Sequence, residues 1–90
     1  MLFRSAFSGH REWISATEQH HRDRCARMLA AVSETARTAY EVLPFEWPGG
    51  LSAHEERFAV AETLAHMEYM RRQRKVEPVR EGGVVRWRKV

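Results

Sequence analysis

Histidine is the residue that first suggests chemistry in this sequence. Five histidines occur among ninety residues, including the adjacent pair His20 and His21, and His66 one helical turn after Glu62. Imidazole and carboxylate groups at this spacing are found in metal sites. A zinc site, however, needs three or four ligands that converge on one point. Neither pair has a third partner whose approach the sequence can fix, so we expect no metal or other cofactor bound by this chain.

The other reactive residues do not combine into a catalytic set. The run "HEER" after Ser52 lacks the second histidine of the zinc-protease pattern. Cys25 falls among apolar residues at helical spacing, and a buried thiol is usually inert. The sequence offers neither a nucleophile with a matching base nor a glycine loop for a phosphate. We therefore expect that this chain is not an enzyme by itself.

Length and composition limit the class of protein. Ninety residues suffice for one small domain with a single core. The single cysteine excludes an internal disulfide and fits a reducing, cytoplasmic compartment. No apolar run is long enough to cross a membrane, so we expect no membrane partner. The net charge of +3 comes from fifteen basic and twelve acidic residues spread over the chain, which is a weak signal for nucleic acid.

The first half of the chain predicts two helices. Apolar residues at helical spacing predict a long amphipathic helix from about Gly9 to Ser33. Thr38 and Glu41 have the spacing of a capping box, which predicts the start of a short second helix. This helix should end near Leu43, because the following Pro44 disfavours helix in the residue before it.

A loop and a third helix follow. We expect Pro44 to Gly50, with its two prolines and two glycines, to be a loop whose Phe45 and Trp47 pack against the core. The run "SAHE" is a second capping box and predicts a helix from Ser52 to about Lys75. We expect one arc of this helix to face the core and Glu62, Thr63 and His66 to lie on the other side. The core-facing arc consists of Phe58, Val60, Ala61, Leu64, Ala65, Met67 and Tyr69.

Glu68 lies near the middle of that apolar arc. A carboxylate is costly to bury without a partner, so Glu68 should form an ion pair. We favour Arg86 as the partner, because a hairpin folded over the third helix would bring this residue near the middle of the helix. Arg88 and His21 are other candidates, and the alternative is a solvated Glu68 at the edge of the helix.

The end of the chain predicts a hairpin and completes the fold. The β-prone runs "VEPVR" and "VVRWR" flank the turn "EGG". Three helices followed by a hairpin is the order of a winged-helix domain. The predicted fold class is therefore mainly α with a small β-hairpin, a three-helix core plus a wing, over residues 9–90. Residues 1–8 would be an N-terminal extension.

Nucleic-acid binding is the first use that this fold suggests, because winged helices can place their last helix in a DNA groove. From Ser52 to Met70, however, the third helix carries four glutamates against the single Arg57, and phosphates would repel it. The basic residues of the wing, and those from Arg71 to Lys75 at the tail of the third helix, could hold a DNA backbone but would read little sequence. These wing residues are Arg80, Arg86, Arg88 and Lys89.

Three stretches carry a resemblance to a known family. The stretches "HHRDRCARMLAAV", "RTAYEVLPFEW" and "ERFAVAETLAHMEYMRRQRKVEPVREGGVVRWR" resemble the C-terminal winged-helix domain of metallo-β-lactamase-fold hydrolases, in the glyoxalase II-like and ribonuclease-like branch. The resemblance covers roughly residues 7–90. It implies a domain that packs on the hydrolase domain, shapes the active-site entrance and sometimes forms a homodimer contact. We assign structural or interaction roles to Glu68, Arg86, His21, His66 and Trp47.

The resemblance does not bring catalysis. The zinc centre of these hydrolases depends on an H-x-H-x-D-H signature, and this signature does not occur in the sequence. The parent hydrolase would therefore bind zinc, whereas this chain would be a fragment or a detached domain without catalytic residues. Two hypotheses stand: an accessory domain of a metal-dependent hydrolase, and a free-standing winged-helix domain that binds nucleic acid.

Overall fold

Three helices and a two-stranded hairpin make up the part of the chain that is described. The computed structural model describes the backbone of residues 10–90 and the side chains of residues 18–90. The expected extension 1–8 and the start of the domain at residue 9 lie outside this range. The elements confirm a mainly helical domain with a small hairpin: α2 (His10–Ala31), α3 (Ala39–Glu46), α4 (Ala53–Arg72), β1 (Val76–Glu81) and β2 (Val84–Lys89).

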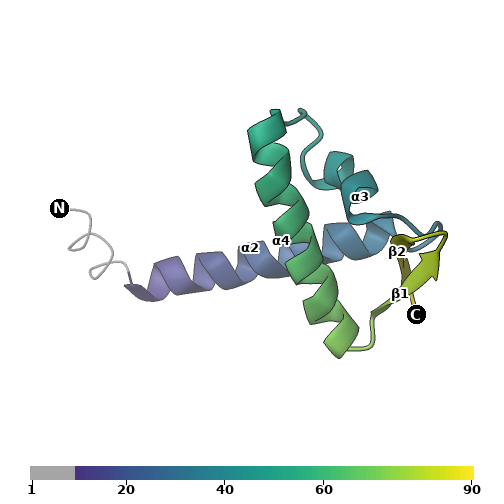
Figure 1. The fold of residues 1–90 in the computed structure, drawn as a ribbon. Helices are drawn as coiled ribbons and strands as arrows, with labels where there is room; N and C mark the ends of the chain where they lie inside the picture. Colours follow the sequence, from purple (N-terminus) through teal and green to yellow (C-terminus); the bar gives the residue numbers. More distant parts are fainter. Residues whose placement is uncertain (1–9) are drawn as a thin grey trace.

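The helix α4 crosses the C-terminal half of α2, and α3 and the hairpin pack around the end of α2 (Figure 1). The core lies at this crossing. Met28 of α2 and Met67 and Met70 of α4 are fully buried there, and the flexible methionine side chain fills irregular space between helices well. None of the described helices is both long enough and apolar enough to cross a membrane. The rest of the buried cluster is Ala31, Val32, Val42, Val76 and Trp87.

The hairpin forms where the sequence predicts it. Gly82 and Gly83 have φ angles of 56° and 79°, a conformation that glycine adopts without steric cost and that tight hairpin turns require. The segment before α3 is tied to β2, because the backbone N–H of Arg37 donates to Trp87 O at 2.9 Å and the N–H of Trp87 donates to Arg37 O at 2.7 Å. The hairpin is thereby held against the end of α2.

The end of α3 differs from the prediction. The capping box of Thr38 and Glu41 is present, but the helix continues through Pro44 to Glu46, where a loop was expected. Proline removes one helical hydrogen bond, and the next turn is still closed by the N–H of Trp47, which donates to Leu43 O at 2.8 Å. The helix is also held from outside by the side chain of its last residue.

That residue, Glu46, joins α3 to α2. Its side chain is only 4% exposed, and its carboxylate accepts hydrogen bonds from Arg24 Nε at 3.0 Å and from Arg27 Nε at 2.6 Å. The bond from Arg27, aided by Arg24, lowers the pKa of the Glu46 carboxyl below its usual value. A nearly buried carboxylate with two guanidinium partners is a strong tether for the end of α3.

The start of α4 agrees with the sequence, but the face that it buries does not. Ser52 caps the helix, and Ser52 and Glu55 form the expected capping box. Of the predicted core arc, however, only Met67 is buried, whereas Phe58 and Leu64 are 65% and 43% exposed. The side expected outside the core is the one that faces α2. The buried residues of α4 are Ala59, Thr63, His66, Met67 and Met70.

Local hydrogen bonds explain how polar residues can occupy this buried side. The Thr63 hydroxyl donates to Ala59 O at 2.8 Å. Nδ1 of His66 lies 2.6 Å from Glu62 O, and because a carbonyl only accepts, Nδ1 is the donor. Polar groups that are paired within their own helix cost little to bury. The small Ala59 and Thr63 also let the two helices approach closely.

Truncation of single apolar residues tests which side of α4 faces the core. We expect Met67→Ala to lower the free energy of unfolding by about 2 to 5 kcal/mol, because it leaves a cavity in the core. The matched variant Leu64→Ala, on the exposed side, should change it by less than about 0.5 kcal/mol. Urea unfolding followed by circular dichroism gives both values. A larger loss for Leu64→Ala than for Met67→Ala would contradict the described packing.

Glu46 predicts how the stability depends on pH. Because its pKa is lowered in the folded chain from the ordinary value of 4.5, the unfolded chain takes up the proton first as the pH falls. The stability contributed by Glu46 is therefore complete above about pH 4.5 and is lost as the pH falls through the folded pKa. We expect Glu46→Gln to cost about 2 kcal/mol at neutral pH.

The pH profile separates this role from simple loss of packing. Between about pH 5 and pH 3, Glu46→Gln should lose less further stability than the parent, because the variant has no carboxyl to titrate at this position. Glu81→Gln, at the exposed hairpin turn, serves as the control and should follow the parent curve. Parallel curves for the parent and Glu46→Gln would show that Glu46 does not contribute in this way.

Candidate functional site

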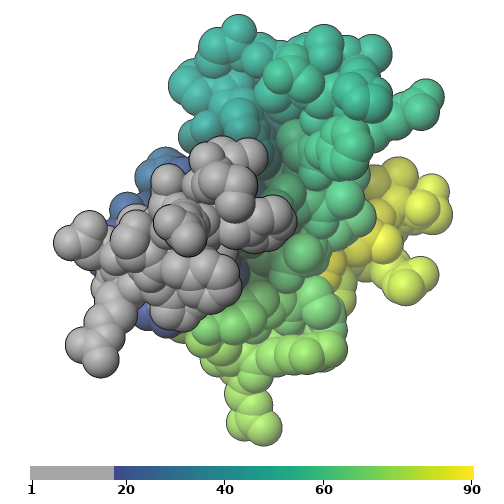
Figure 2. Space-filling view, turned by 90° about the vertical axis from the view of Figure 1, so that its left-hand side faces the viewer, coloured from purple at the N-terminus to yellow at the C-terminus, as the bar shows by residue number. Residues whose placement is uncertain are grey.

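The exposed side of α4 carries an apolar surface. We call it the outer face of α4 and define it by Phe58, Ala61, Leu64, Ala65 and Tyr69, all of which are exposed. Atoms of α4 are visible at the molecular surface along the length of the helix (Figure 2). Isolated exposed apolar residues are common, but a continuous group on one helix face often marks an interaction site. The outer face is therefore the candidate docking surface of the domain.

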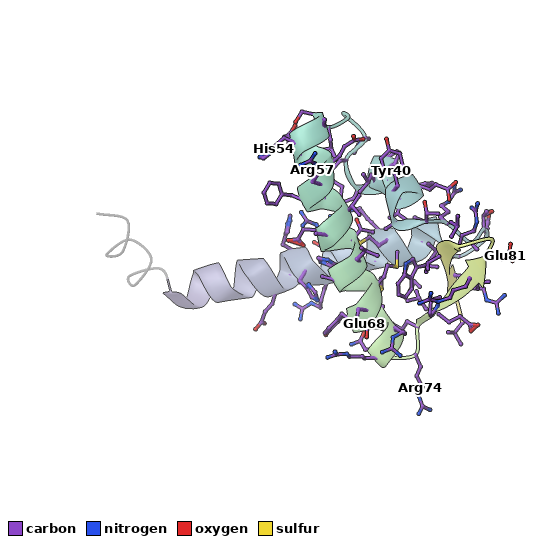
Figure 3. The ribbon with its side chains drawn as sticks, viewed as in Figure 1. Tyr40, His54, Arg57, Glu68, Arg74 and Glu81 are labelled. Carbon is purple, nitrogen blue, oxygen red and sulfur yellow. The ribbon has the colours of Figure 1, made fainter. Side chains whose placement is uncertain are left out.

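Charged residues also lie on this side of α4. Arg57 and Glu68 lie toward opposite ends of α4 (Figure 3), and Glu62 lies between them, with its side chain 52% exposed. This charge arrangement is mixed in sign, so the surface does not favour a polyanion.

The expected pair between Glu68 and Arg86 is wrong. Glu68 is half-buried and accepts hydrogen bonds within its own helix from Arg71 Nε and Nη2 at 2.8 and 2.6 Å, and these bonds lower the pKa of Glu68. Arg86 instead donates to Glu41 at 3.0 Å, which ties the hairpin to the start of α3. Glu68 therefore pairs within its own helix, and the alternative of a solvated Glu68 describes it better.

Trp47 and Phe45 occupy different environments. Trp47 packs against the core cluster, as expected, and the Arg24 guanidinium lies 5.2 Å from the centre of its ring. Phe45 is 46% exposed, so the prediction that it packs against the core is wrong. Its ring instead lies 4.7 Å from the Arg37 guanidinium, a cation–π contact that keeps it at the surface.

Two histidines and the cysteine meet where α2 crosses α4. His21 and Cys25 are one turn apart on α2, and His21 Nε2 lies 3.7 Å from Cys25 Sγ. His66 approaches from α4, with its ring centre 4.8 Å from that of His21. One ligand atom from each of the three residues lies within 4.8 Å of the others. The sequence could not show a third partner for either histidine pair. In the fold, Cys25 and a histidine from the other helix complete a set of three with His21.

The surroundings of this cluster combine burial with an open side. His66 is buried, while His21 and Cys25 are half-buried. Burial raises the pKa of the Cys25 thiol, and the nearby Lys75 opposes this shift. The ring of Tyr69 meets that of His21 edge to face at 4.8 Å. A groove of about 330 Å³ runs along His21 and Cys25 and is also lined by Tyr69, Met70 and Lys75.

The single signal for this cluster in the sequence is the spacing of His21 and Cys25. Residues four apart lie on one helix face, so these two could have been recognised as a pair. The approach of His66 depends on which side of α4 faces α2. Because the apolar pattern pointed to the opposite side, His66 was expected away from the core.

Comparisons with known proteins agree with the fold. Residues 25–90 match the family model described as "Metallo-beta-lactamase-like, C-terminal domain". A crystal structure of a "Beta-lactamase domain protein from Burkholderia ambifaria" is similar with a TM-score of 0.79 and 24% sequence identity. The match covers 86% of this chain and 23% of that chain, so this chain spans less than a quarter of that relative. At this identity the likeness shows the fold alone. No curated protein matches.

Proposed function

Since the chain belongs to the family of metallo-β-lactamase-like C-terminal domains, we propose that it is a non-catalytic accessory domain of a metal-dependent hydrolase. In this proposal the three helices and the hairpin form a winged helix that packs on a metallo-β-lactamase-fold hydrolase domain. The domain helps to shape the active-site entrance of the hydrolase, and the zinc and the catalytic residues belong to the hydrolase domain. The free Cys25 fits the reducing conditions of the cytoplasm.

The outer face of α4 is the observation that carries this proposal. It presents two aromatic side chains, Phe58 and Tyr69, and the aliphatic Leu64, and such residues are the usual anchors of protein interfaces. The domain has its own buried core of methionine, valine and tryptophan side chains, so these residues are not needed for folding. A second apolar side on a helix is expected when the helix contacts two partners.

The length of the similar structure supports a second domain. The matched region accounts for 23% of that chain, which leaves most of it for another part. Its description as a β-lactamase domain protein is consistent with a hydrolase domain as the partner. For this chain we infer that the same kind of domain covers the outer face, either within one longer polypeptide or as a separate chain.

The arginines of the hairpin argue against the alternative of a nucleic-acid-binding domain. Arg86 pairs with Glu41 at 3.0 Å and Arg88 pairs with Glu77 at 2.8 Å. Two of the four hairpin cations that could contact a DNA backbone therefore already have carboxylate partners. The same side of α4 as the outer face also carries glutamates, as described above. Weak contact with phosphates is the most that this surface supports.

DNA binding by the chain should be weak and insensitive to sequence. At physiological salt we expect a Kd above about 10 µM for unrelated duplexes. The affinity should fall further as the salt concentration is raised, because only phosphate contacts contribute. Fluorescence anisotropy with two labelled duplexes of different sequence measures both properties. A sequence-selective complex with a sub-micromolar Kd would favour the nucleic-acid-binding hypothesis over the accessory domain.

Photo-crosslinking from the outer face tests the proposed partner. We expect p-benzoylphenylalanine in place of Phe58, produced in the native cells, to crosslink to a peptide of a domain that carries H-x-H-x-D-H. The reason is that Phe58 would lie inside the interface with the hydrolase domain. The same group in place of Val84, which is exposed on the hairpin, is the control and should not reach that domain. Mass spectrometry of the crosslinked peptides identifies the partner.

Other crosslinks would contradict the proposal. A crosslink from position 58 to a second copy of this chain would indicate a homodimer contact on the outer face. Equal crosslinking from positions 58 and 84 would show that the outer face is not a selective docking surface.

A further inference from the structure

We propose that His21, Cys25 and His66 form a zinc-binding site at the crossing of α2 and α4. The proposal does not depend on the proposed accessory role. Two imidazoles and a thiolate are ligands that zinc prefers in proteins. They come from two helices, so a bound ion would also link those helices.

The distances suit a tetrahedral ion. Zinc lies about 2.0 Å from nitrogen and about 2.3 Å from sulfur, so two nitrogens in a tetrahedral site lie about 3.3 Å apart and a nitrogen and a sulfur about 3.5 Å apart. His21 Nε2 and Cys25 Sγ already lie 3.7 Å apart. The widest separation in the cluster is within 4.8 Å. Zinc binding would therefore draw the ligand atoms together by about 1 Å.

The hydrogen bond of His66 orients its ring for metal binding. Because Nδ1 donates to Glu62 O at 2.6 Å, the lone pair of the neutral imidazole is on Nε2. Histidine ligands of metals almost always donate their other ring nitrogen to a carbonyl or carboxylate, which fixes the tautomer and the ring plane. The Glu62 carboxylate lies 3.6 Å from the same Nδ1. His66 thus has the supporting contact of a metal ligand before any ion binds.

The groove beside His21 and Cys25 gives an ion access from solvent and leaves room for a fourth ligand next to these two residues. Its volume of about 330 Å³ far exceeds the space needed by one water molecule. Zinc binds the thiolate, so binding breaks the S–H bond of Cys25, forms a Zn–S bond and releases one proton to the solvent. A zinc site with three protein ligands commonly keeps a water molecule in its fourth position.

A simpler account of the same contacts exists. The two imidazole rings could be a plain stacked pair, tilted by 36°, with the thiol as a weak hydrogen-bond partner. Metal titration separates the two accounts, because only the first gives stoichiometric binding by all three residues.

The first experiment uses this chain without substitutions and without a tag, and the metal ion alone. Co²⁺ added to the metal-free chain should produce visible d–d bands and a sulfur-to-cobalt charge-transfer band, and one Zn²⁺ per chain should displace it. Because Cys25 is the only cysteine, its reaction with a thiol reagent should slow at least about tenfold with Zn²⁺ and recover with EDTA. Absence of both the cobalt bands and the thiol protection would overturn the proposal.

Variants assign the ligands. Cys25→Ser and His21→Gln should each weaken zinc binding at least about tenfold, the scale on which even supporting contacts act. His20→Gln, next to His21 but exposed and in contact with Arg24, is the matched control and should bind zinc like the parent. Circular dichroism checks the fold of each variant, and the thiol-protection measurement needs no variant at all. Equal zinc affinity in the parent, Cys25→Ser and His21→Gln would also overturn the proposal.

Discussion

The packing of one side of α4 against α2 is the interaction on which the rest of the structure depends. Burial of Thr63, His66 and Met67 at this crossing builds the core and sets the rotation of α4 about its axis. The same rotation turns Phe58 and Leu64 outward and brings His66 to the α2 side chains. The candidate docking surface and the candidate zinc site are therefore two consequences of a single helix contact.

Several basic residues of the domain form ion pairs within it. Arg24 and Arg27 hold Glu46 at the end of α3, and Arg86 holds Glu41 at the start of the same helix. These arginines connect α3 to α2 and to the hairpin. A sequence that is basic by composition thus uses several of its cations for internal structure, and its net charge is a poor guide to its partner.

The two proposed sites are neighbours on the surface. Tyr69 belongs to the outer face and also contacts the ring of His21, a proposed zinc ligand. A metal ion bound by His21, Cys25 and His66 would restrain the crossing of α2 and α4. The orientation of the outer face follows from that crossing, so metal binding would make the docking surface more rigid. Such preorganisation lowers the entropic cost of association.

The sequence by itself determined the local features of this protein. The capping boxes at Thr38 and Ser52 and the glycine turn of the hairpin were predictable because each depends on residues close together in the chain. The family resemblance was also readable from short motifs.

Only the tertiary structure decided which side of α4 is buried. The apolar pattern in the sequence identifies the more hydrophobic side of a helix. In a helix with two apolar sides, this more hydrophobic side can face a partner and the other side can face the core. The continuation of α3 through Pro44, the partners of Glu68 and Arg86, and the meeting of His66 with Cys25 likewise depend on contacts between elements, which local spacing does not encode.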